Sequence, residues 1–182
     1  MNTEKSATVR LSQGAAPRET LTPKSAIRGN VAFDCGWGRL VFGQTFATAS
    51  DLAECLRAER PGQRDIAFYV LDPHVVLAAA PQELFLDPSH TYRLELDKYV
   101  PAKTKPRGFH VRHLKSLQDA EEINRIYAAR RMVTVAPNFF WEHRHSDTIT
   151  YFVAVDDQTN AIVGTVTGVD HKEAFGDLEN GS

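Results

Sequence analysis

The chain of 182 residues contains little cysteine, with Cys35 and Cys55 as its only two. Their spacing fits neither a disulfide framework nor a set of metal ligands, because both patterns need several cysteines at characteristic intervals. A nucleophilic role would need a nearby base, and the sequence places none. We therefore expect both cysteines to be small buried apolar side chains.

Long apolar runs and an excess of one charge are also missing. No stretch approaches the roughly 20 apolar residues that a membrane-spanning helix needs, and the N-terminal residues lack the apolar core of a signal peptide. The formal net charge is -2, which carries no electrostatic signature of nucleic-acid binding. We therefore expect a cytoplasmic protein with no membrane and no nucleic-acid partner.

The first part of the chain divides into a tail and a small module. Residues 1–30 are rich in Ser, Thr, Lys, Arg and Pro without apolar periodicity, so they cannot offset their ordering entropy and a disordered tail is predicted. Residues 31–99 are predicted to form a small α+β module. Its expected elements are a hairpin over 31–46, a short helix opened by Ser50-Asp51 and stopped by Pro61-Gly62, and strands at Ile66–Leu71, Val75–Ala79, Leu84–Leu86 and Tyr92–Leu96.

Residues 100–108 contain two prolines, basic residues and few large apolar ones, a composition that predicts a linker and a domain boundary. The segment 109–182 has a clearer pattern. Ser116 followed by Asp119 resembles a capping box at the start of a helix. The expected elements are a strand at Phe109–Leu114, a helix through Arg131, a second short helix capped by Asn138, and strands at Thr148–Val155 and Ala161–Val169.

A histidine pair after the second helix is a candidate metal or substrate site. His143 and His145 follow Glu142, but side chains two apart do not share a helix face and no further ligand is placed, so metal binding is not expected. Two interpretations of these histidines remain open: they are solvated, or they line a substrate pocket. The run Phe139-Phe140-Trp141 is typical of core packing.

The order strand, helix, short helix, strand, polar turn, strand resembles the opening of the GNAT N-acetyltransferase fold. The residues that carry it are Phe109–Leu114, Asp119–Tyr127, and the hairpin from Tyr151–Asp156 to Ala161–Val166. The resemblance implies an α+β protein in which a small module precedes the first half of a GNAT (acyl-CoA N-acyltransferase) domain at 109–182. It also implies that the segment after the first helix lines the acceptor pocket, which makes Trp141, His143 and His145 the substrate-binding candidates.

A second resemblance covers most of the chain. The runs Arg64–Leu77, Leu86–Leu94 and Cys35–Phe46 are similar to the N-terminal region of bacterial N-acetylglutaminylglutamine synthetases, which join a GNAT domain to an ATP-grasp ligase domain. The resemblance implies acetyl transfer from acetyl-CoA to the amine of glutamine or a glutamine dipeptide in compatible-solute synthesis. ATP and Mg would act in the downstream domain, and an asparagine-synthetase-like amidotransferase would be the pathway partner.

The sequence departs from the GNAT pattern in one respect. A Gly-rich loop that opens a helix normally binds the pyrophosphate of acetyl-CoA through free backbone N–H groups, and this sequence has none. We therefore expect an N-terminal fragment that is inactive in isolation, with no catalytic or cofactor-binding residue assigned and with self-association through an open sheet edge. The alternative is a non-catalytic acyltransferase-like module for binding or assembly.

Overall fold

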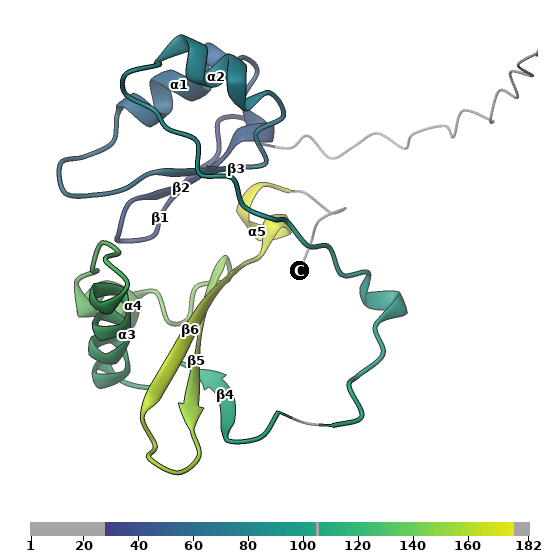
Figure 1. Cartoon of the computed structure of the whole chain (residues 1–182), viewed down its shortest axis with the longest axis vertical. Helices are drawn as coiled ribbons and strands as arrows, with labels where there is room; N and C mark the ends of the chain where they lie inside the picture. Colours follow the sequence, from purple (N-terminus) through teal and green to yellow (C-terminus); the bar gives the residue numbers. More distant parts are fainter. Residues whose placement is uncertain (1–27, 105, 177–182) are drawn as a thin grey trace, which may run out of the picture.

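The computed structural model describes residues 28–104 and 106–176, and the predicted tail lies, up to residue 27, outside them. The described residues form two small three-stranded sheets and five α-helices, so the α+β class predicted from the sequence is confirmed. The two sheets belong to different parts of the chain and lie one above the other in Figure 1. No helix among the described residues is both long enough and apolar enough to span a bilayer.

The first sheet combines a hairpin with a parallel crossover. Strands β1 (Ala32–Asp34) and β2 (Arg39–Phe42) pair antiparallel, as the sequence predicted, and β2 pairs in parallel with β3 (Ile66–Phe68). A parallel pair needs a crossover connection. That connection runs through a short 3-10 turn (Gly43–Thr45) and helix α1 (Ala49–Arg57). The strand predicted at Ile66–Leu71 is therefore present but shorter, because Tyr69 takes a positive φ of 54°.

The strand predicted at Val75–Ala79 is wrong, because these residues belong to helix α2 (Pro73–Ala79). Pro73 occupies the first helical turn, where its fixed φ and its missing N–H are tolerated. Val76 is buried in a cluster with Leu52 and Ala53 of α1. Packing of the two helices therefore outweighs the β-propensity of the paired valines.

The strands predicted at Leu84–Leu86 and Tyr92–Leu96 are also wrong. The chain from residue 84 to residue 104 has no strand and only one 3-10 turn, at Leu96–Lys98. Tyr92 is 90% exposed and Leu94 is 62% exposed. A strand needs a hydrogen-bonding neighbour, and alternation in sequence cannot supply one.

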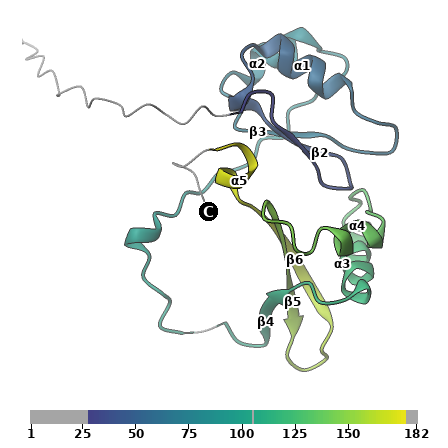
Figure 2. The same ribbon diagram turned by 180° about the vertical axis from the view of Figure 1, so that it is seen from behind.

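The second sheet is antiparallel throughout. Its order is β4 (Phe109–His113), β5 (Ile149–Asp156), β6 (Ile162–Val169). Helices α3 (Leu117–Ala129) and α4 (Pro137–Glu142) lie together beside this sheet in Figures 1 and 2. The buried side chains of β5 alternate along the strand and pack with those of α3 and α4 in one core.

Two helix ends in the second module differ from the prediction, and its sheet contains one register shift. Helix α3 ends at Ala129, before Arg131, because Arg131 has a positive φ of 57° that an α-helix cannot contain. Helix α4 begins at Pro137 with Ala136 as its N-cap, so Asn138 lies inside the helix and does not cap it. The register of β5 and β6 shifts between Ala154, which faces Gly164, and Val155, which faces Ile162.

The last described helix, α5 (His171–Phe175), packs against the first sheet. The Phe175 ring is fully buried, with its centroid 4.8 Å from that of Phe42 on β2, and the Arg28 N–H donates to the Phe175 carbonyl. Figure 2 shows α5 lying next to the first sheet. The chain that follows β6 therefore returns to the first module, while the domain boundary at 100–108 remains a prediction.

Candidate functional site

The predicted substrate-binding residues lie on α4 and in the turn that follows it. Trp141 is on α4, His143 is its C-cap, and His145 follows in the loop before β5. All three therefore lie at one end of the second sheet. Their role in substrate binding stays a prediction.

The contacts of these residues are local. The Arg144 guanidinium lies 3.9 Å from the centre of the Trp141 ring, in a cation–π contact. The His143 ring stacks on Phe139 with 4.2 Å between ring centroids, and its Nδ1 lies 2.8 Å from the Phe139 carbonyl oxygen. His145 is exposed. The structure thus brings Trp141 and His143 to one helix end without joining them in a hydrogen-bonded constellation.

The connection between α3 and α4 is fixed by a side-chain amide. The Val135 N–H donates to Asn124 Oδ1 at 2.8 Å, and the Asn124 amide donates back to the Val135 carbonyl. Val135 itself is 3% exposed. This double hydrogen bond satisfies the buried backbone of the connection and sets where α4 begins.

The start of α3 is fixed by a partly buried ion pair. The Arg112 guanidinium on β4 donates to both carboxylate oxygens of Asp119, at 2.7 and 2.9 Å. Asp119 also accepts from the Lys115 N–H, while its own N–H donates to the Ser116 side chain. The hydrogen bonds from Arg112 are the largest cause that lowers the pKa of Asp119. The predicted cap is confirmed, and these contacts position α3 on the sheet.

A loop of the first module covers this region of the second. In the hairpin turn, Gly36 has φ +81°, and a Cβ built there would lie 2.4 Å from Cγ1 of Val135 and 2.9 Å from the Phe139 ring. Trp37 packs against the core of the second module. The glycine at position 36 is therefore required both by the turn and by the close approach of the two modules.

Polar side chains are buried beneath the Gly36 turn. Tyr151 on β5 is 4% exposed, Tyr127 on α3 is 6% exposed, and Cys35 in the turn is 3% exposed. Burial raises the pKa of both tyrosines, and it raises the pKa of the Cys35 thiol to about 11. All three groups are therefore neutral at physiological pH. The predicted burial of Cys35 is confirmed, whereas Cys55 is only half-buried.

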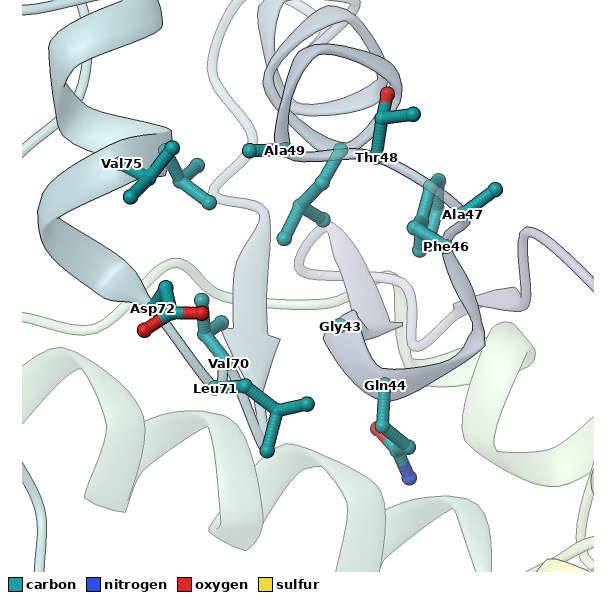
Figure 3. A pocket seen from close by; sticks show the side chains of 12 residues that line it. Gly43, Gln44, Phe46, Ala47, Thr48, Ala49, Val70, Leu71, Asp72 and Val75 are labelled. Atoms are coloured by element: carbon teal, nitrogen blue, oxygen red, sulfur yellow. The ribbon is translucent and has the colours of Figure 1, made fainter.

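A separate groove of about 310 Å³ lies in the first module, where β2 and β3 end and α1 and α2 begin (Figure 3). Ligands of open α/β sheets often bind at the carboxyl ends of parallel strands. Here no basic side chain lines the groove, and Thr48 already caps α1 through the Asp51 N–H. An anion therefore finds no partner of opposite charge. The lining residues are Gly43, Gln44, Phe46, Ala47, Thr48, Ala49, Leu52, Val70, Leu71, Asp72, Val75 and Val76.

No family model, curated protein or solved structure matches the chain. Within residues 28–104 and 106–176, no group of three or more His, Cys, Asp or Glu side chains is arranged to hold a metal ion. Function must therefore be argued from the geometry of the second module and its covering loop.

The tyrosines beneath the loop are absent from the sequence-based candidates. Tyr151 lies in the strand predicted at Thr148–Val155, where alternation puts it on one face with Ile149, Val153 and Val155. A useful signal was nevertheless present, because a buried tyrosine among aliphatic neighbours carries a hydroxyl that needs a partner. The nearness of Cys35 has no local signal, since the two residues lie far apart in the chain.

Proposed function

We propose that the second module is a GNAT-type acyltransferase domain whose part in the reaction is to hold the acceptor, the amine of glutamine or a glutamine dipeptide. The observation that supports this best is the element order β4-α3-α4-β5-β6, with an antiparallel sheet and the two helices packed on it. This is the arrangement that the family resemblance implies. The aromatic helix α4 follows α3, where the resemblance puts the acceptor pocket.

Acetyl transfer needs a neutral amine, a base and hydrogen-bond donors for the developing oxyanion. The described residues do not fit the pyrophosphate of acetyl-CoA, because no Gly-rich loop opens any of the five helices. Thr48 and Ser116 also cap the N-terminal turns of α1 and α3. We therefore assign no step to acetyl-CoA, ATP or Mg²⁺. The proposed role of this chain is to bind, desolvate and orient the acceptor.

The two tryptophans provide the test. Trp37 and Trp141 are the only tryptophans of the chain, and both pack against the core of the second module. Titration with glutaminylglutamine is expected to change the tryptophan fluorescence saturably, within the range of about 1 μM to 1 mM that is usual for enzyme substrates. N-acetylglutaminylglutamine, which has no free amine, is the control ligand and is expected to bind more weakly. An unchanged spectrum at millimolar dipeptide would contradict the proposal.

One observation favours the alternative of an assembly module. The strand-less segment from residue 84 to residue 100 exposes large apolar side chains, a feature that marks interaction surfaces. The exposed ones are Phe85, Leu86, Tyr92, Leu94, Leu96, Tyr99 and Val100. If the chain self-associates and binds no dipeptide, assembly is the better description of its function.

A further inference from the structure

Tyr151 has a buried hydroxyl without a hydrogen-bond partner among the described residues. The hydroxyl belongs to the inner face of β5, whose other members are aliphatic and buried. A buried hydroxyl that makes no hydrogen bond loses its water without compensation, which costs stability. Phenylalanine would pack in the same place without that cost, so the hydroxyl calls for an explanation.

Other side chains that carry hydroxyls lie near Tyr151 in the fold. Tyr127 on α3 packs in the same core as Tyr151, and the rings of both tyrosines contact the Phe140 ring. Thr167 on β6 is the cross-strand partner of Tyr151, so their side chains lie on the same face of the sheet. The Phe140 ring forms an apolar wall, edge-to-face with Tyr151 at 5.0 Å. Hydroxyl-bearing side chains from α3, β5 and β6 thus lie near one another beside the Phe140 ring.

The turn at residues 35–38 is the cover of this polar cluster. Its hydrogen bonds go to its own module: Gly36 N–H to Asp34, Cys35 N–H to Gly38, and Arg64 N–H to the Trp37 carbonyl. In the described residues no hydrogen bond joins the turn to the second module, which it meets through the apolar contacts of Gly36 and Trp37. The turn is therefore held against the second module by apolar contacts.

We propose that Tyr151, Tyr127 and Thr167 form a binding site for a neutral carboxamide, and that residues 35–38 cover it. A tyrosine or threonine hydroxyl both donates and accepts, as does a carboxamide, so each can satisfy the other. The chemistry disfavours a charged ligand. A carboxylate only accepts hydrogen bonds, and none of the described Lys or Arg side chains is buried to pair with it, so its lost hydration would go uncompensated.

An ammonium ligand is disfavoured for a different reason. It only donates, so it cannot accept from the hydroxyl protons of the site, and no buried carboxylate faces it. Asp34 is 45% exposed in its side chain and already accepts from the Gly36 N–H. A buried ammonium without a buried partner would lose its hydration uncompensated.

The identity of the whole ligand as a glutamine peptide rests on the proposed function, whereas the carboxamide preference rests on the Tyr151 site. The test measures binding of propionamide, propionate, propylamine and glutaminylglutamine to the wild-type chain, Tyr151→Phe and Tyr99→Phe. Tyr99 is more than half exposed and far from the site in sequence, so Tyr99→Phe is the matched control. Tyr151→Phe is expected to bind propionamide about fivefold more weakly, the loss of one neutral hydrogen bond.

The outcomes separate the two proposals. Loss of propionamide binding in Tyr151→Phe supports the carboxamide site even if glutaminylglutamine does not bind, in which case only the proposed function fails. Equal binding of glutaminylglutamine to wild type and Tyr151→Phe overturns the carboxamide site and leaves the proposed function standing. If none of the ligands binds, both proposals are overturned. If propylamine binds more tightly than propionamide, only the carboxamide site is overturned.

Stability and thiol labelling provide independent readouts. Tyr151→Phe is expected to melt at the same temperature as wild type or higher, because an unpaired hydroxyl is removed; a lower melting temperature would indicate a structural water there and overturn the inference. In a Cys55→Ala background Cys35 is the only thiol. Adding Gly36→Ala is expected to make Cys35 react faster with a thiol reagent than in the Cys55→Ala chain, because the new Cβ forces the turn away from Val135. Equal labelling rates would overturn the cover.

Discussion

Substitution of Asp119 by asparagine tests how the second module positions α3. The Asp119 side chain is 9% exposed, and its carboxylate accepts two hydrogen bonds from Arg112 and one from the Lys115 N–H. Loss of one partner of a fully buried pair costs about 3–5 kcal/mol. Because 23% of the Arg112 side chain remains exposed and water can screen it, we expect a cost of about 2–3 kcal/mol at neutral pH.

The pH dependence of this cost has a fixed sign. The folded-state pKa of Asp119 is lowered, chiefly by Arg112. A lowered pKa adds stability that is present above the unfolded-state pKa of about 4 and is lost as the pH falls through the folded-state value. The difference between wild type and Asp119→Asn is therefore expected to be full at pH 7 and to shrink in acid.

Urea unfolding followed by circular dichroism measures this difference. The matched control is Glu122→Gln, which breaks the more exposed pair of Glu122 with Arg125 on the same helix. An exposed pair of this spacing contributes about 0.5 kcal/mol or less. Equal midpoints for the two variants, or an Asp119→Asn deficit that persists unchanged at low pH, would refute the reasoning.

Three further predictions concern the ends and edges of the modules. Phe175→Ala is expected to destabilise the chain by about 3–5 kcal/mol in urea, because a fully buried ring leaves a cavity against Phe42; an unchanged midpoint would show that α5 does not dock in solution. Among the described residues β6 pairs only with β5 and exposes Val163 and Val166, so light scattering is expected to detect self-association that Val163→Lys reduces; a monodisperse wild-type monomer contradicts this. Limited proteolysis is expected to cut within residues 84–108 before any site in the sheets, and first cleavage inside β5 or β6 would contradict the assignment.

Elements specified by near neighbours were predictable from the sequence. The alternation of Ile149, Tyr151, Val153 and Val155 marks the inner face of β5, and all four are buried. The spacing from Ser116 to Asp119 likewise marks the start of α3, where the cap forms. Such signals are local, so neither depends on where the rest of the chain lies.

Elements that depend on distant partners were not predictable. Val75 and Val76 favour a strand by propensity, but contact with α1 decides for a helix. Tyr92 and Leu94 belong to an alternating run that finds no strand to pair with. The cluster around Tyr151 could not be predicted for the same reason, because the covering turn and the tyrosines belong to two modules that lie far apart in the sequence.

The most direct test of the account is an amide NMR titration of the chain with glutaminylglutamine. Acceptor binding by the second module predicts saturable shift changes in α3, α4 and β5 and in the turn at residues 35–38 that covers them. The amides that line the groove between α1 and α2 are expected to stay unchanged. Shifts confined to that groove, or no shifts at millimolar dipeptide, would contradict the claim that the second module holds the acceptor.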